Sequence, residues 1–282
     1  LLARTGRRFA RDPRIHRALH QLYTRWDEPE LALGELTTLS RIEPQETAHL
    51  AMLGEQLMAQ GRREQARAAW RRILHTSVDR ARAHATLGGL YLDHDLELEA
   101  LAEYREAVRL RGDEIVYAQG LAEVLERLNL NQEAIAQWQR VLALAGDDRN
   151  LRRQARRRLV GLWARSGQLQ QKLAELEART IRDARVNRDA QVPERDRSVE
   201  DPAAGRKLIH PLQDGELEAA LEAGRFVAEA YLYLAGRRLR SSADYRRRAE
   251  SALERVIALD PTDVESLLGL ERLRAARGDE RG

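Results

Sequence analysis

Four sets of residues recur along this chain at a spacing of 34 positions. The sets are Leu19, Leu53, Leu87 and Leu121; Ala32, Ala66, Ala100 and Ala134; Leu36, Trp70, Tyr104 and Trp138; and Tyr23, Leu57, Tyr91 and Leu125. A fixed period of this length is typical of a helical solenoid, in which each repeat buries its apolar side against its neighbours. The regularity predicts an all-α fold and a binding activity, and it leaves the partner open.

Each repeat is predicted to be an antiparallel pair of helices. Leu87 and Tyr91 stand four residues apart, as do Ala100 and Tyr104, so each couple shares one side of a helix. The break between them falls at Asp95. The equivalent position of every repeat holds a residue that tolerates a tight turn. These residues are Asp27, Gly61, Asp95 and Asn129.

The pattern within a repeat resembles a known family. Leu-Gly-x-x-Tyr at 87–91, followed by Ala-x-x-x-aromatic-x-x-Ala at 100–107, resembles the tetratricopeptide repeat, and Pro44 and Pro261 match that family's helix-terminating proline. The match is strongest over residues 47–146 and extends back to residue 13. The resemblance implies a right-handed α-solenoid of antiparallel helix pairs.

The period also suggests a division of the chain. We expect the end of a preceding repeat at 1–12, about five helix pairs at 13–181, a charged and proline-interrupted connector at 182–213, and helical repeats with a capping helix at 214–282. The fifth pair needs four extra residues near 147–152. Because the chain opens at Leu1 without an initiator methionine, we interpret it as a fragment or a processed product.

The amino-acid composition excludes several kinds of site and of protein. The 282 residues are 43% apolar and include no cysteine, so disulfides and cysteine metal sites are excluded. No apolar run reaches the roughly 18 to 20 residues that a membrane-spanning helix needs. We therefore expect a soluble protein, with a cytoplasmic location favoured and a periplasmic one left open. The arginine-rich stretch at 152–158 fits either a solvated helix face, which we favour, or a patch for an acidic partner.

Motifs that would make this chain an enzyme are missing. The sequence has no phosphate-binding loop, dinucleotide fingerprint, nucleophile elbow or His-Glu-x-x-His motif. His16 and His20 are one helical turn apart, and we interpret them as packing residues because no third ligand is placed nearby. We predict no catalytic residue, metal or cofactor. Nucleic acid is not expected either, since acidic and basic residues are interleaved and the aromatic residues fall in packing positions.

The resemblance implies that the first helix of each repeat lines a concave groove that holds a partner. The groove positions in this sequence are Arg17, Gln21, Ala48, Ala51, Glu55, Met58, Arg82, Ala85, Gly89, Leu92, Gln119 and Glu123. The centre of this surface is small and apolar. We expect a peptide with apolar anchors to lie over Ala51, Met58, Ala85 and Leu92, with flanking acidic groups near Arg17 and Arg82.

Two alternatives remain open at this point. The small residues of the groove also suit a purely structural role, in which they let neighbouring first helices approach closely. For the chain as a whole, a non-catalytic scaffold or adaptor is the preferred interpretation. The other is the regulatory repeat region of a larger bacterial enzyme or signalling protein whose catalytic domain lies outside this sequence.

Overall fold

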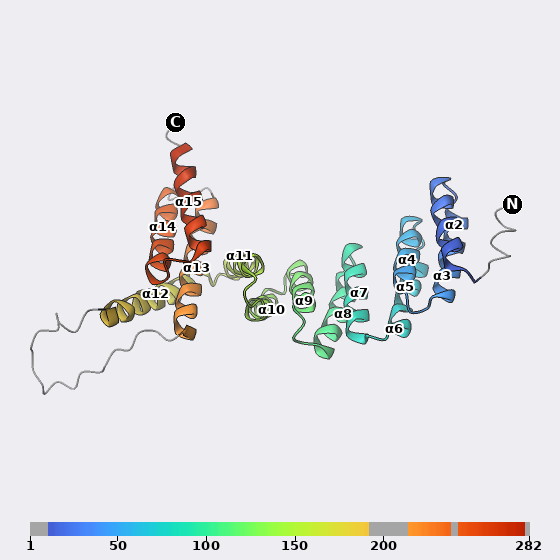
Figure 1. Cartoon of the computed structure of the whole chain (residues 1–282), viewed down its shortest axis with the longest axis horizontal. Coiled ribbons are helices and arrows are strands. Elements are labelled where there is room, and N and C mark those ends of the chain that lie inside the picture. Colours follow the sequence, from blue (N-terminus) through green and yellow to red (C-terminus); the bar gives the residue numbers. More distant parts are fainter. Residues whose placement is uncertain (1–10, 192–213, 238–241, 280–282) are drawn as a thin grey trace, which may run out of the picture. The chain divides into compact units, whose positions relative to one another are not determined.

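The computed structural model describes residues 11–191, 214–237 and 242–279, and this part of the chain consists of helices and turns without strands. The chain forms two compact units that divide between Gln137 and Trp138, within helix α10 (Asn131–Leu144). Figure 1 shows the helices of unit 1 following one another in chain order. The predicted all-α architecture is confirmed.

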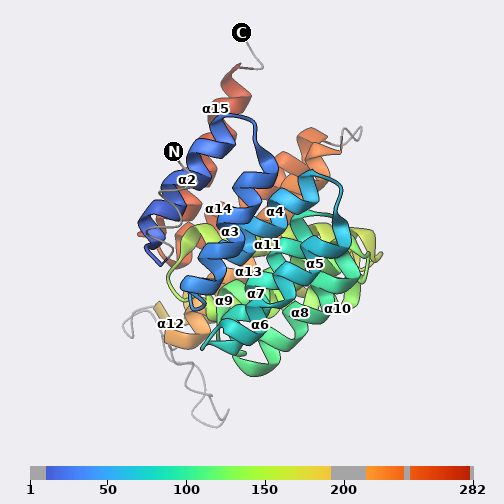
Figure 2. The same cartoon turned by 90° about the vertical axis from the view of Figure 1, so that its right-hand side faces the viewer.

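Unit 1 is built from consecutive helix pairs. Its helices before α10 are α2 (Pro13–Arg25), α3 (Pro29–Ile42), α4 (Ala48–Ala59), α5 (Arg63–Arg71), α6 (Ile73–Thr76), α7 (Arg80–Asp93), α8 (Glu97–Leu110) and α9 (Ile115–Arg127). Helix α2 packs against α3, α4 against α5 and α7 against α8, while α3 and α8 also contact the first helix of the following repeat. The views in Figures 1 and 2 agree in placing α7 and α8 side by side.

The turns between paired helices lie at the predicted positions. Asp27, Gly61, Asp95 and Asn129 have φ angles of 56°, 75°, 55° and 58°. These are left-handed backbone conformations, which glycine adopts freely and which aspartate and asparagine tolerate better than other residues. The structure thus explains why only three residue types occur in this slot of the repeat.

The residues of the four 34-residue sets form the core between helices. All are buried except Tyr104, which is partly exposed. Close approach depends on glycine: a Cβ atom at Gly54 would lie 1.9 Å from Nε1 of Trp70, and one at Gly88 would lie 2.8 Å from Cδ2 of Tyr104. In these two repeats the aromatic ring of the second helix therefore fills the space that a missing side chain leaves on the first helix. This is the packing that the repeat pattern predicts.

Unit 2 contains four long helices and a fifth that ends the described chain. They are α11 (Arg149–Arg165), α12 (Leu169–Gln191), α13 (Asp214–Gly236), α14 (Ser242–Leu259) and α15 (Val264–Asp279). Helix α13 packs against α11, α12 and α14, and α14 packs against α15. Gly167, which turns the chain between α11 and α12 with φ 74°, stands 38 residues after Asn129. The four extra residues expected in this repeat are therefore present.

Unit 2 departs from the expected division in two ways. Helices α11 and α12 belong to the same unit as α13, although the sequence pattern assigned residues up to 181 to the first array. Helix α12 also continues through ten residues of the predicted connector, to Gln191. No proline or glycine interrupts residues 169–191, so the first helix-breaking residue is Pro193. The rest of the connector lies outside the described residues, as do residues 1–10 of the expected preceding repeat.

Candidate functional site

The predicted groove residues all lie on the first helices α2, α4, α7 and α9 of unit 1, and we call this surface the first-helix face. Arg17, Gln21, Ala48 and Arg82 are exposed; Ala51, Glu55, Met58, Ala85, Gly89, Gln119 and Glu123 are half-buried. Two exposed apolar side chains lie on the same helices, Met52 on α4 and Val116 on α9, with 43% and 64% of their surface accessible.

The two central alanines lie against the junctions between repeats. Ala51 packs against a buried cluster formed by Leu50, Ile73 and Ala83, which joins α4 to α6 and α7. Ala85 packs in the same way against Ala81, Ala107 and Tyr117, which join α7 to α8 and α9. Small side chains are thus used here for close helix packing. Both alanines keep part of their surface accessible, so the packing role and a binding role are compatible.

Leu92 is not available on this face, contrary to the sequence prediction. Its side chain is buried, with only 7% of the residue accessible. The C-terminal end of α9 lies beside it, because the Arg127 guanidinium donates to the Leu92 carbonyl at 3.1 Å and to Asp95 at 3.3 Å. A side chain of the neighbouring repeat therefore reaches the Leu92 backbone, and the Leu92 side chain is buried where helical spacing alone assigns it to the surface.

Several charged groups of the face already have partners within unit 1. Arg17 donates to Glu43 at 2.5 Å, and His49 contacts the same carboxylate at 2.8 Å. These hydrogen bonds hold the pKa of Glu43 below its usual range, and the one from His49 has the largest effect. The charge of Arg17 is consequently compensated by Glu43 of the same chain. The sequence prediction had instead paired Arg17 with an acidic group of the ligand.

His16 and His20 are buried, which agrees with their interpretation as packing residues. His16 lies 2.5 Å from Glu35, and His84, at the same position two repeats later, lies 2.7 Å from Glu103. Each of these contacts joins the two helices of one repeat. The described residues contain no group of three or more His, Cys, Asp or Glu side chains that could hold a metal ion.

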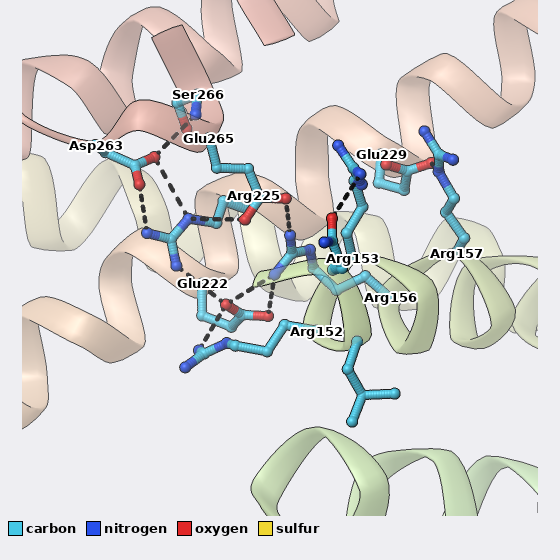
Figure 3. A network of polar contacts seen from close by, with 12 residues as sticks. Arg152, Arg153, Arg156, Arg157, Glu222, Arg225, Glu229, Asp263, Glu265 and Ser266 are labelled. Carbon is cyan, nitrogen blue, oxygen red and sulfur yellow. Dashed lines mark hydrogen bonds and ion pairs between the residues drawn. The ribbon is translucent and has the colours of Figure 1, made fainter. Parts of the chain in front are cut away.

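A second concentration of charge lies inside unit 2, where Figure 3 shows arginines of α11 and α13 meeting carboxylates of α13 and α15. Arg156 is 1% accessible; it donates to Glu222 at 2.9 Å and also pairs with Glu265. Arg225 donates to Asp263 at 2.8 Å and to Glu222 at 3.2 Å. These ion pairs connect three helices that are far apart in sequence.

This network changes the interpretation of the arginine-rich stretch at 152–158. Arg152 donates to Glu218 and Glu222 at 2.8 Å each, and Arg156 is fully enclosed, so these two side chains are neither a solvated face nor an open patch. Helical spacing places residues 152 and 156 on one side of α11, the side that faces α13 and α15. Their role is to bind these helices together.

Two carboxylates of the network, Glu222 and Asp263, are held ionised. Burial by itself would raise the pKa of Glu222, but the charges and hydrogen bonds of Arg156 and Arg152 outweigh it and lower that pKa below its ordinary value. The pKa of Asp263 is lowered for the same reason, with burial opposed chiefly by a hydrogen bond from Arg225. With their oxygen atoms taken up by arginines, we assign these groups to structure rather than to proton transfer.

No helix in the described part of the chain combines the length and apolar character needed to cross a membrane.

Comparison with known proteins finds no matching family model and no matching curated protein. Among solved structures, that of MamA is 15% identical, with a TM-score of 0.42 over 56% of this chain and 85% of that chain. The C-terminal part of a TPR repeat-containing protein from Cytophaga hutchinsonii is 15% identical, with a TM-score of 0.42 over 95% of this chain and 92% of that chain.

A third structure is that of YrrB, described as a TPR protein with an unusual peptide-binding site. It is 12% identical, with a TM-score of 0.35 over 96% of this chain and 97% of that chain. All three identities are below 25% and all three TM-scores are below 0.5, so these likenesses carry no conclusion about partner or activity. The helix pairs, their turns and their core contacts define the fold on their own.

Proposed function

We propose that unit 1 is a protein-interaction scaffold that holds a peptide or partner protein on the first-helix face. The observation that carries this proposal is the row of small and flexible apolar side chains on two successive first helices. On α4 these are Ala48, Ala51, Met52 and Met58, and on α7 the row continues with Ala85 and Gly89. None of these six residues is fully buried. Two of them, Ala51 and Ala85, also make the packing contacts described above.

The character of these side chains suits an apolar ligand. Methionine is unbranched and polarizable, so exposed methionines adapt to the shape of apolar anchors. Alanine and glycine leave room for the backbone of a bound segment to approach closely. The exposed Val116 extends the apolar surface onto α9. A peptide lying across α4, α7 and α9 would therefore bury side chains that the isolated chain leaves partly in water.

The charges around this row define the ends of the proposed site. Arg82 is exposed at the start of α7, where it can meet an acidic group of the ligand. Arg17 is bound by Glu43, so a ligand carboxylate there would have to displace an existing ion pair. We accordingly centre the proposal on α4, α7 and α9, and we assign α2 to the end of the array.

Replacing both Ala51 and Ala85 by glutamate should abolish capture of the protein partner from a lysate of the source organism. The two carboxylates would place charge where the ligand is expected to bury apolar groups, and unpaired buried charge is strongly unfavourable. The measurement is affinity purification with quantitative mass spectrometry, comparing the variant with the wild-type chain. Helical circular dichroism and thermal unfolding report whether the variant still folds.

A matched control places the same charges on the opposite helices of the same repeats. Ala68 on α5 and Ala102 on α8 are exposed alanines of second helices, and their replacement by glutamate should leave capture unchanged. Met52→Glu adds a variant at an exposed position outside the core, in case the double variant unfolds. Equal capture by Met52→Glu, by the folded double variant and by the control would refute the proposed site.

A further inference from the structure

Tyr104 differs from the other aromatic residues of the 34-residue sets. It belongs to the second helix α8, yet it is the one member of the four sets that stays partly exposed. Trp70, at the equivalent position one repeat earlier, is fully buried, and its Nε1 donates to the Ala51 carbonyl at 3.1 Å. The polar atom of Trp70 is thus satisfied inside the array.

The ring of Tyr104 lies in a gap between α7 and α9 that three glycines create. A Cβ atom at Gly120 would lie 2.2 Å from Cε1 of the ring and 2.4 Å from Cζ, and one at Gly88 would lie 2.8 Å from Cδ2. At Gly89 the nearest atom would be the Tyr104 hydroxyl, at 3.5 Å. Because Gly89 belongs to the first-helix face, the hydroxyl of a second-helix residue reaches that face.

The charges of two carboxylates, Asp93 on α7 and Glu123 on α9, act on this hydroxyl. Burial raises the pKa of Tyr104 to about 12, and the negative charges of Glu123 and Asp93 add to the rise. The phenol is therefore protonated at neutral pH and can both donate and accept a hydrogen bond. Glu123 accepts from the Gln119 amide at 3.2 Å, so the described structure gives this half-buried carboxylate a neutral partner.

We infer that the Tyr104 hydroxyl and the Glu123 carboxylate select a partner segment that carries a lysine or arginine beside its apolar anchors. This inference rests on the proposed function. A cationic side chain laid over Gly89 would donate to both oxygen groups, and it would compensate the charge of Glu123 and of the exposed Asp93. The apolar row on α4 and α7 supplies the affinity, and Tyr104 with Glu123 supplies the preference for a basic residue.

The test uses the full chain as bait for a phage-displayed library of random peptides, followed by affinity measurements with the selected peptides. Wild-type chain should enrich peptides that place lysine or arginine next to large apolar residues. Glu123→Gln should still enrich the apolar residues and lose the basic preference. A selected basic peptide should bind Glu123→Gln roughly tenfold more weakly, since a charged hydrogen-bonded contact is lost.

Tyr104→Phe keeps the ring that fills the gap and removes only the hydroxyl. It should weaken the same peptide about two- to tenfold while the thermal unfolding of unit 1 stays close to that of the wild type. Peptides without basic residues, or an unchanged basic preference in Glu123→Gln, would overturn the inference. Failure to select any peptide, or equal binding to the Ala51→Glu, Ala85→Glu double variant, would instead count against the proposed function itself.

Discussion

Replacing Glu222 by glutamine should lower the free energy of unfolding of unit 2 by about 3 to 5 kcal/mol, because the change leaves buried arginine charge without its main partner. Glu222 accepts hydrogen bonds from Arg152, Arg156 and Arg225, and Arg156 has 1% of its surface accessible. Glutamine preserves the shape of the side chain and removes its charge. Urea unfolding followed by hydrogen exchange in α11 and α13 would measure the loss.

The control for this prediction is an ion pair on the surface of the same unit. Glu254 pairs with Arg274 at 2.9 Å, and both side chains are more than half exposed. Glu254→Gln should change the free energy of unfolding by less than about 1 kcal/mol. A similarly small effect of Glu222→Gln would show that the enclosed network contributes little to holding α11, α13 and α15 together.

Acid provides a second measurement of the same prediction. Since the folded-state pKa of Glu222 is lowered, its contribution is fully present above the unfolded pKa of about 4.3 and is lost as the pH falls through and below that value. The urea midpoint of unit 2 should therefore drop as the pH falls below about 4.3 in the wild-type chain. Glu222→Gln should remove part of this pH dependence.

Replacing Gly54 by alanine should destabilise unit 1 by roughly 3 kcal/mol, at the upper end of the usual cost of overpacking a core. The added Cβ would lie 1.9 Å from Nε1 and 2.3 Å from Cδ1 of Trp70, so the indole would have to move. That movement would also break the hydrogen bond from Trp70 to the Ala51 carbonyl. Thermal unfolding of the variant, read by circular dichroism, measures the effect.

The same substitution elsewhere in unit 1 should have the opposite sign. Gly34 lies within α3, and a Cβ atom there would meet nothing within 4 Å. Gly34→Ala should stabilise the unit by about 0.5 to 1 kcal/mol, because alanine favours the helix over the unfolded chain. Two Gly→Ala changes of equal sign and size would contradict the packing described for Gly54.

The repeat architecture could be predicted from sequence because its contacts are local and periodic. Leu87, Ala100 and Trp70 recur at fixed spacing, and the structure buries them where one helix meets the next. The turn positions were equally predictable, since a left-handed residue such as Asp95 or Asn129 limits the choice of side chain. In both cases, the residues that determine the local structure lie within about one repeat of each other in the sequence.

The ion network of unit 2 could not be predicted in this way. Arg156 contacts partners 66 and 109 residues away, and no period relates those positions. Local sequence shows only that arginines cluster, which is compatible with a solvated surface. The place of the Tyr104 hydroxyl at the first-helix face was missed for a related reason, because the ring occupies space left by Gly120, a residue of the following repeat.

Two predictions were wrong because they used only charge and helical spacing: the start of the connector and the exposure of Leu92. The charged residues at 182–191 continue α12, since nothing in that stretch breaks a helix before Pro193. Leu92 was assigned to the surface by its place on α7, while the structure buries its side chain. Of the twelve predicted groove residues, the remaining eleven keep some accessible surface on the first helices.

The central claim is that a partner lies on the first helices of unit 1, and photo-crosslinking from single positions tests it most directly. A photoreactive amino acid at Met58 or Ala85 should form adducts with the same captured protein, whereas one at Ala68 or Ala102, on the second helices, should form few or none. Adducts that arise mainly from Ala68 and Ala102 would contradict the account.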